Sequence, residues 1–410
     1  MNAGNTISLK SFLLLLFLNL ASLPQITCAE TGFAGLHSLE RLEEASLLMV
    51  DTSGHKLVSL RPEKPMIPAS TLKLVTALLA LETWGQKHDF VTDFGLDHDN
   101  ILWIKGYGDP FLISEEIDQI VMGLQKKGLK VINGIGIDES YFDSRIHVDG
   151  QTDTNNPYDA PLAPLAANFN TINIRRENGQ TFSAEKQTPL TLLMKELSKN
   201  LPSGQHRIRL VDQNQSARLF AEILMAKLKR QGVEIVQAQI LKGSFPDTRF
   251  PYYRHRNSHA LPEIIRAMLQ YSNNFIANQL FLLLGVEKQG APANMEKSRS
   301  VATEQINRLF NWQDFSIVEG SGISRKNRLS AQQLIDVLQR FSAWRDLLRK
   351  QTDGILAKSG TLKGISTYAG YINRQGKWLP FALMINEPVD YGFRKRVAEE
   401  LSHWNELGQK

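Results

Sequence analysis

The chain has 410 residues, of which 42% are hydrophobic and 22% charged, with a formal net charge of +5. This composition is typical of a globular protein that is long enough for two or more domains. The charge excess is modest, and no nucleic-acid motif, low-complexity tract or basic stripe accompanies it. We therefore exclude nucleic acid as an expected partner.

The first 29 residues have the pattern of a cleavable secretory signal peptide. They carry one lysine, Lys10, then an apolar run over residues 12–23 and the small-residue triplet T-C-A at 27–29. A retained anchor is the less favoured alternative, because the apolar run is short for a membrane span. Cys28 is the single cysteine of the chain, so cleavage after Ala29 would leave no thiol. We expect an exported protein, in the periplasm or cell-wall space, that needs no disulfide.

The predicted elements begin with a β-hairpin in "ASLLMVDTSGHKLVSL", residues 45–60, where two alternating runs flank a Ser-Gly turn. A proline-rich loop over residues 61–69 follows. The next segment, from Ser70 to Gly85, is predicted to be a largely buried helix, because its apolar residues recur at helical spacing and the glycine is a natural stop.

In the middle of the chain short strands alternate with helices, and one pattern occurs twice. Residues 117–137 and 217–240 each have an amphipathic helix, a basic last turn, a glycine and then a strand. We interpret residues 92–248 as an inserted α/β domain, so that residues 30–91 and 249–410 form one domain. The similarity of the two segments could also be coincidental, because helix–glycine–strand connections are common.

The last third of the chain is predicted to be helical and then β-rich. Helices are expected over residues 262–271, 273–285 and 330–344, the last with Ser330 as its N-cap, and strands within 354–386. The closing helix has an apolar stripe, which we expect to pack on the sheet, with a membrane-surface helix as the alternative. This stripe consists of Phe393, Val397, Leu401, Trp404 and Leu407.

The pattern S-x-x-K occurs at Ser53, Ser70 and Ser183, so the pattern alone has little specificity. Only Ser70 opens an apolar helix, where a spacing of three residues puts its side chain on the same face as Lys73. The free N–H groups of a helix start favour an oxyanion, and burial beside a second lysine would lower the pKa of Lys73 toward that of a base. The alternative is an ordinary helix start with an exposed lysine.

Two further segments carry candidate catalytic residues. Ser272 and Asn274 lie at a break between two helical runs, where an N-cap for the second helix is the alternative interpretation. Lys358, Ser359 and Gly360 lie on a predicted strand, where a lysine on an edge strand beside a bulge glycine is the alternative.

The segment "YYRHRNSHA" contains His255 and His259. Both precede the next helix, and no cysteine or carboxylate nearby in the sequence completes a metal site. We therefore expect a crossover loop here rather than a metal centre.

In the order S-x-x-K, S-x-N and K-S-G, the three motifs resemble the active-site motifs of penicillin-binding proteins and serine β-lactamases. The long insertion between the first two motifs is similar to that of the D-alanyl-D-alanine carboxypeptidase/endopeptidase family S13, the penicillin-binding protein 4-like proteins. "GYGDPFL", "APLAANFNTINI" and "EGSGISRKNRLSA" also resemble stretches of that family. The resemblance implies an α+β fold: a β-lactamase/transpeptidase-like domain, with an antiparallel sheet flanked by helices and a helical subdomain, plus the inserted α/β domain.

The resemblance also implies a role for each catalytic candidate. Ser70 would be the acylated nucleophile and Lys73 its general base. Ser272 would relay a proton to the leaving amine, and Asn274 would hold the substrate amide. Lys358 would supply positive charge near the terminal carboxylate of the substrate and lower the pKa of Lys73.

The substrate-binding residues that the resemblance implies are Ser359, Gly360, Thr361, Asp109, Arg325 and Lys363. The Ser359 hydroxyl would bind the terminal carboxylate, and the N–H groups of Ser70 and Thr361 would form the oxyanion hole. Two departures stand out: K-S-G replaces K-T-G, and Lys363 stands where the best-known relatives have glutamine. The insertion is also short between residues 175 and 207, so we expect a third, accessory subdomain to be reduced or absent.

The implied reaction is acyl transfer at the D-Ala-D-Ala end of peptidoglycan stem peptides, without a metal or cofactor. β-Lactams would then be covalent inhibitors, and peripheral membrane association and a homodimer stay open. A serine β-lactamase is one alternative, although no E-x-x-L-N stretch lies between Ser272 and Lys358. A catalytically silent wall-binding or scaffold protein is the other, although the five catalytic side chains are all present.

Overall fold

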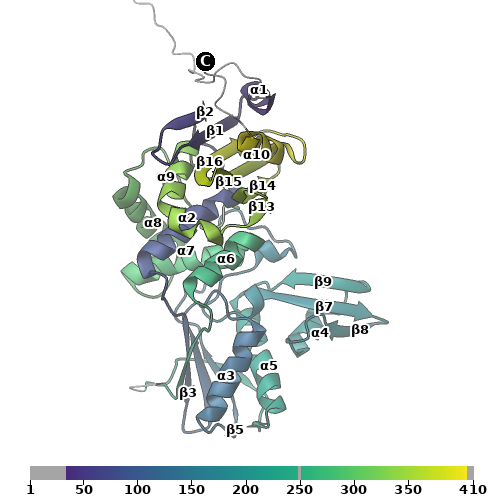
Figure 1. Cartoon of the computed structure of the whole chain (residues 1–410). Coiled ribbons are helices and arrows are strands. Elements are labelled where there is room, and N and C mark those ends of the chain that lie inside the picture. Colours follow the sequence, from purple (N-terminus) through teal and green to yellow (C-terminus); the bar gives the residue numbers. More distant parts are fainter. Residues whose placement is uncertain (1–33, 248–250, 404–410) are drawn as a thin grey trace, which may run out of the picture.

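The computed structural model describes residues 34–247 and 251–403. Figure 1 shows two bodies that are joined by connecting segments of the chain. The first body contains both the purple N-terminal and the yellow C-terminal elements, and the second contains elements from the middle of the chain. The expected signal peptide lies outside the described residues. In the described part of the chain no helix is both long and apolar enough to cross a membrane.

The first body is built on a six-stranded antiparallel sheet in the order β13-β14-β15-β16-β1-β2. Strand β1 from the N-terminal segment pairs with β16 from the C-terminal segment, with Leu47 opposite Leu383. The predicted hairpin is confirmed as β1 and β2. The strands are β1 (Ala45–Val50), β2 (Lys56–Leu60), β13 (Lys350–Thr352), β14 (Ile355–Leu362), β15 (Ile365–Arg374) and β16 (Lys377–Ile385).

Helices cover both faces of this sheet, as Figure 1 shows, and bury a separate core on each face. The predicted cap is confirmed, since the Ser330 hydroxyl accepts a hydrogen bond from the N–H of Gln333 at 3.1 Å. One face packs against α2 (Lys73–Trp84), α6 (Leu261–Tyr271), α7 (Asn274–Gln289), α8 (Met295–Phe310) and α9 (Ala331–Phe341). The other face packs against α1 (Ala34–Glu40) and α10 (Phe393–His403).

The apolar stripe of the closing helix packs on the sheet, as predicted, over the part that the structure describes. Val397 and Leu401 of α10 are buried in one cluster with Leu47 and Phe381 of the sheet. Trp404 and Leu407 lie outside the described residues.

The second body is built on a five-stranded mixed sheet in the order β11-β6-β4-β3-β12 with its own core. The two similar sequence segments lie side by side, because β10 pairs with β5 and β11 pairs with β6, both in parallel. Strands β5 (Val131–Ile132) and β10 (Glu234–Ile235) form a separate two-stranded sheet. The strands of the five-stranded sheet are β3 (Val91–Leu96), β4 (Ile101–Gly106), β6 (Gly134–Asp138), β11 (Ile240–Lys242) and β12 (Tyr253–Arg256). The helices that pack on it are α3 (Ser114–Lys126) and α5 (Gln213–Arg230).

A small three-stranded sheet, in the order β8-β7-β9, extends to one side of the molecule in Figure 1. It comprises β7 (Thr171–Glu177), β8 (Gln180–Ser183) and β9 (Gly204–Arg209), and α4 (Leu192–Ser198) packs beside it. The accessory unit is therefore a three-stranded sheet with one short helix.

The prediction of a crossover loop around His255 is wrong. This segment forms strand β12, which pairs with β3 at the edge of the second sheet. The imidazole is buried, and its Nε2 lies 2.9 Å from a carboxylate oxygen of Glu116 on α3, a partner too distant in sequence to be predicted. Among the described residues, no group of three or more His, Cys, Asp or Glu side chains is placed to hold a metal ion.

From the packing of the six-stranded sheet we predict that alanine substitutions of two leucines change the free energy of unfolding by different amounts. Leu383 in β16 is fully buried against α1 and α10, whereas Leu192 at the start of α4 is 64% exposed. We expect Leu383→Ala to lower the free energy of unfolding by about 2–5 kcal/mol, because it leaves a cavity. Leu192→Ala should change it by less than about 0.5 kcal/mol. Urea unfolding followed by circular dichroism measures both, and equal effects would contradict this account of the core.

Candidate active site

Ser70 and Lys73 lie at the junction of a short 3-10 turn, η1 (Ala69–Leu72), and helix α2. Neither η1 nor α2 has a side-chain cap, so Ser70 does not serve as a capping serine. Lys73 is fully buried, which excludes the alternative of an exposed lysine at an ordinary helix start. The first turn leaves backbone N–H groups without helical partners beside the Ser70 hydroxyl.

The Lys73 amine has three polar neighbours. Its Nζ lies 3.0 Å from Ser70 Oγ, 2.7 Å from Asn274 Oδ1 and 2.7 Å from the carbonyl oxygen of Ser321. Burial, and next the positive charge of Lys358, lower the pKa of Lys73 well below its ordinary value of 10.5, while Glu319 acts in the opposite direction. The structure therefore favours the neutral amine that a general base requires.

The geometry assigns a direction to the lone pair of that neutral amine. A neutral lysine has two N–H groups, and the Asn274 and Ser321 oxygens are placed to accept both. Asn274 is oriented for this contact, since its Nδ2 donates to the carbonyl oxygen of Tyr158 at 3.4 Å. The lone pair is then left to accept the Ser70 proton, so the pair has the geometry of a nucleophile and its base.

The S-x-N segment is the turn between α6 and α7. Ser272 is the C-cap of α6 and has left-handed backbone angles (φ 54°, ψ 37°), which are uncommon for a residue other than glycine and occur often at functional sites. The N-cap of α7 is Asn273, whose side chain accepts a hydrogen bond from the N–H of Ile276 at 3.1 Å. Because Asn273 serves as the cap, Asn274 is available to contact Lys73.

Lys358 approaches the same place from strand β14. Its Nζ donates to Ser272 Oγ at 2.9 Å and to the carbonyl oxygen of Ser359 at 2.7 Å. Burial is the largest cause that lowers the pKa of Lys358, to about 7, followed by the positive charges of Arg394 and Arg349. Within the part of the chain that the structure describes, the Ser359 hydroxyl has no hydrogen-bond partner, so it is free to bind a ligand.

Gly360 allows β14 to pass close to the nucleophile. A Cβ atom at this position would lie 2.8 Å from the backbone nitrogen of Ser70 and 2.2 Å from Thr367 Oγ1. Distances this short exclude any side chain, so glycine is required for the strand to reach the Ser70 N–H. The structure thus brings Ser70, Lys73, Ser272, Asn274 and Lys358 together, with Gly360 beside them.

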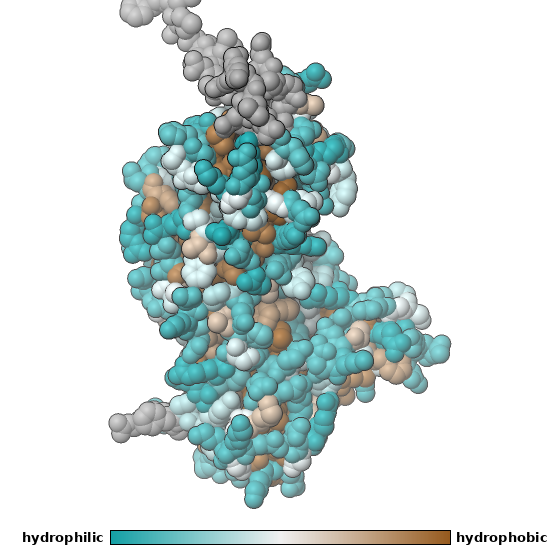
Figure 2. All heavy atoms as spheres, in the orientation of Figure 1, coloured by the Kyte–Doolittle hydropathy of each residue, from teal (hydrophilic) through white to brown (hydrophobic). Residues whose placement is uncertain are grey.

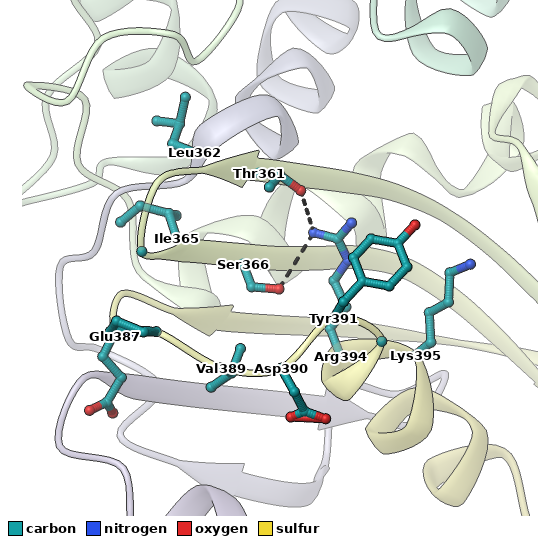
Figure 3. A pocket seen from close by; sticks show the side chains of 13 residues that line it. Thr361, Leu362, Ile365, Ser366, Glu387, Val389, Asp390, Tyr391, Arg394 and Lys395 are labelled. Atoms are coloured by element: carbon teal, nitrogen blue, oxygen red, sulfur yellow. Dashed lines mark hydrogen bonds between the residues drawn. The ribbon is translucent and has the colours of Figure 1, made fainter.

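Arg394 of α10 is a residue that the sequence analysis missed. Its Nη1 donates to the carbonyl oxygen of Gly360 at 2.6 Å and to Thr361 Oγ1 at 2.8 Å, and it points toward Ser366 in Figure 3. A cavity of about 260 Å³ lies between this end of β14 and the loop that precedes α10, with Tyr391 at its rim. Arg394 therefore holds the K-S-G strand from the side of the closing helix, and no local motif signals such a contact.

The remaining substrate-binding candidates fall into two groups. Arg325 and Lys363 are both exposed and adjacent, since Arg325 Nη2 donates to the carbonyl oxygen of Lys363 at 2.5 Å. Asp109 is buried, and its carboxylate accepts hydrogen bonds from Asn257 Nδ2 and the N–H of Phe111. Burial raises the pKa of Asp109 to about 6. The structure does not place Asp109 with the Ser70 group, and a substrate-binding role for it stays a prediction.

The other two S-x-x-K serines serve local turns. Ser53 Oγ lies 2.7 Å from a carboxylate oxygen of Asp51 in the turn between β1 and β2. Ser183 Oγ donates to the carbonyl oxygen of Glu185 at the end of β8.

Comparisons with known proteins point to one peptidase family. The model of the D-Ala-D-Ala carboxypeptidase 3 (S13) family matches residues 36–201 and 195–351. The D-alanyl-D-alanine carboxypeptidase of Actinomadura sp. (strain R39) is 23% identical over 440 residues, which cover 88% of this chain and 81% of that protein. The D-alanyl-D-alanine carboxypeptidase DacB of Haemophilus influenzae is 25% identical over 391 residues, which cover 78% of this chain and 80% of that protein.

The fold is also found among solved structures. Penicillin binding protein 4 from Haemophilus influenzae matches with a TM-score of 0.71 and 18% sequence identity, over 90% of this chain and 100% of that chain. The same protein complexed with a β-lactam matches with a TM-score of 0.67. The predicted α+β fold is confirmed. Because the family model covers most of the chain, this protein belongs to the D-Ala-D-Ala carboxypeptidase 3 (S13) family, as its three motifs indicate.

Proposed function

We propose that this protein is a serine DD-peptidase that cleaves the D-Ala-D-Ala end of peptidoglycan stem peptides through an acyl-enzyme on Ser70. The observation that carries the proposal is the fully buried Lys73 amine, 3.0 Å from Ser70 Oγ, with two other acceptors for its N–H groups. Membership of the carboxypeptidase family supports the same activity.

In the acylation step, the Lys73 amine takes the proton of the Ser70 hydroxyl while Oγ attacks the carbonyl carbon of the penultimate D-alanine. The carbonyl oxygen gains negative charge, and the N–H groups of Ser70 and Thr361 stabilise it. Lys358 and the Ser359 hydroxyl bind the terminal carboxylate of the substrate.

Collapse of the tetrahedral intermediate breaks the peptide bond and releases D-alanine. The leaving nitrogen takes the proton of the Ser272 hydroxyl, which Lys358 contacts at 2.9 Å. Ser272 then regains a proton from the Lys73 ammonium, so that Lys73 is again the neutral base. Water then attacks the ester carbonyl, and Ser70 regains its proton as the shortened peptide leaves. If the leaving amine is the side chain of a second stem peptide, the same steps constitute an endopeptidase.

β-Lactams are expected to acylate Ser70 and to leave slowly. The related Haemophilus influenzae protein has been solved in complex with a β-lactam, which supports this expectation. The carboxylate that acts electrostatically on Lys73 belongs to Glu319. Its two oxygens accept five hydrogen bonds from its own loop. It is therefore not free to activate water for rapid hydrolysis, which favours a DD-peptidase over a serine β-lactamase.

The site of action follows from the substrate. We propose that the chain is exported through its N-terminal signal and acts in the periplasm or cell-wall space, where peptidoglycan is exposed. Fractionation of the producing cells, with mass spectrometry of the N-terminus, tests this: an intact residue 1 in the cytosolic fraction would contradict it. Peripheral membrane association and a homodimer are tested by the same fractionation and by light scattering.

Ser70 is expected to be the residue that forms the covalent adduct. A fluorescent penicillin should label the wild-type chain, and Ser70→Ala should abolish the labelling. Ser53→Ala and Ser183→Ala are matched controls from the same S-x-x-K pattern and should label normally. Persistent labelling of Ser70→Ala would refute the assignment.

Lys73→Met is expected to leave labelling possible but slow. Loss of a positioned general base typically lowers a rate by about 10²–10⁴-fold. Stopped-flow acylation kinetics measure the change, and a decrease below about tenfold would argue that Lys73 is not the base.

The pH dependence of acylation should report the charge of Lys358. Since the pKa of Lys358 is lowered to about 7, its amine is charged below this pH and neutral above it. The second-order acylation rate by a penicillin with a free carboxylate should therefore fall as the pH rises through about 7. The corresponding penicillin methyl ester, which lacks the carboxylate, should not show this fall; equal profiles for the two would count against Lys358 as the carboxylate partner.

A further inference from the structure

The loop between α8 and α9 packs closely against the turn that carries the nucleophile. Gly322 has a left-handed backbone (φ 84°), and a Cβ atom there would lie 1.8 Å from the carbonyl oxygen of Ala69. Gly320 also packs closely on α7, where a Cβ atom at this position would lie 2.5 Å from the Cβ atom of Phe281. The loop is thus pressed against both η1 and α7, and small changes in its shape would be transmitted to Ser70 and Lys73.

One buried carboxylate sets the shape of this loop. Glu319 is fully buried. One of its oxygens accepts hydrogen bonds from the N–H and the hydroxyl of Ser321, at 2.7 and 2.6 Å. The other accepts from Gly322 N–H at 2.7 Å, Ser324 N–H at 3.3 Å and Asn327 Nδ2 at 2.7 Å. Five donors from four residues therefore converge on one side chain.

These contacts lead directly to the general base. The residue whose N–H and hydroxyl Glu319 holds, Ser321, is also the residue whose carbonyl oxygen accepts from Lys73 Nζ at 2.7 Å. The adjacent Gly320 is anchored as well, because its N–H donates to Asn278 Oδ1 and its carbonyl accepts from Thr76 Oγ1. The position of one acceptor of the Lys73 amine is therefore fixed by Glu319.

Glu319 also places a negative charge near that amine. In the described residues no basic side chain lies within ion-pair distance of its carboxylate, so neutral donors hold the charge in the interior. The charged groups that face Lys73 are Glu319 from this loop and Lys358 from β14, and they act on it with opposite signs. A buried charge without a cationic contact is costly, which argues for a functional reason to keep it.

We propose that Glu319 is a positioning residue for acylation: it fixes the Ser321 carbonyl that orients the Lys73 amine, and its charge offsets that of Lys358. This inference rests on the proposed function, and it concerns a residue that lies just outside the three motifs. Two separable effects follow. The geometry of the loop controls the rate of acylation, whereas the charge controls the pH at which Lys73 becomes neutral.

The sign of the charge effect can be stated in advance. Negative charge near an amine favours its protonated form and so raises its pKa. Removal of the charge should therefore lower the pKa of Lys73 further, and the rise of the acylation rate on the acid side should move to lower pH. An effect on packing alone would lower the rate without moving this midpoint.

The test compares Glu319→Gln with Glu319→Asp in the full chain. Stopped-flow acylation with a fluorescent penicillin is measured over a range of about five pH units, from roughly pH 4 to 9. Glu319→Gln should lower the plateau rate by roughly a hundredfold, the scale of an ångström-sized misplacement, and shift the acid midpoint to lower pH. Glu319→Asp keeps the charge, so its rate should fall while its midpoint stays near that of the wild type.

Glu116→Gln is the matched control. Glu116 is equally buried and accepts hydrogen bonds from His255 and Ser258, but it belongs to α3 in the inserted part. This variant should change stability and leave both the acylation rate and the midpoint unchanged. If Glu319→Gln does not fold, a midpoint in Glu319→Asp shifted to lower pH would contradict the charge effect, and an unchanged plateau rate would contradict the geometric one.

The outcomes separate this inference from the proposed function. If the wild-type chain is not labelled by penicillin, the proposed function fails. If the wild type is labelled and Glu319→Gln matches it in both rate and midpoint, Glu319 has no positioning role. If Glu319→Gln is slower without a shift of midpoint, the charge effect is refuted and only the structural role remains.

Discussion

A lysine amine buried without access to water is the constraint on which the catalytic body depends. Moving Lys73 Nζ out of water is unfavourable unless its polar atoms are satisfied and its charge is removed. Three elements meet this requirement: the turn that carries Ser70, the start of α7 with Asn274, and the loop that presents the Ser321 carbonyl. The same contacts that stabilise the buried amine also direct its lone pair at the nucleophile. One set of hydrogen bonds therefore both stabilises the buried Lys73 amine and orients it for catalysis.

The second lysine makes this arrangement dependent on charge. Lys358 is also buried, and its positive charge lies close enough to lower the pKa of Lys73, while Glu319 acts the other way. Arg394 contacts the carbonyl of Gly360 from α10 and in turn contributes to the lowered pKa of Lys358. The charge state of the Lys73 amine is thus set by residues from three other segments: β14, the loop before α9, and α10. In the six-stranded sheet, β1 from the N-terminal part of the chain pairs with β16 from the C-terminal part. This pairing brings the two ends of the chain into one body.

Much of this could be predicted from the sequence, because the signals are local. Apolar periodicity indicated α2 and α7, and three ordered motifs indicated Ser70, Asn274 and Lys358, which the structure brings together. Strand β12 was missed, since it is stabilised by pairing with β3 and by Glu116 on a distant helix. Arg394 was missed for the same reason, since it contacts Gly360 and Thr361, which lie far from it along the chain. Glu319 opens the stretch "EGSGISRKNRLSA" and its hydrogen bonds are local, but its link to Lys73 runs through the Ser321 carbonyl, a contact that the sequence does not show. Asp109 was chosen by resemblance, and its burial against Asn257 was not visible in the sequence.

The central claim is that Lys73 is a neutral amine in the resting protein. It can be measured directly by NMR of the chain labelled with ¹³C and ¹⁵N in lysine, following the Cε and Nζ signals that disappear in Lys73→Arg. The account predicts that these signals titrate with a midpoint well below 10.5, the ordinary pKa of a lysine side chain, because burial and Lys358 disfavour the charged form. A midpoint for the Lys73 amine near 10.5 would contradict it.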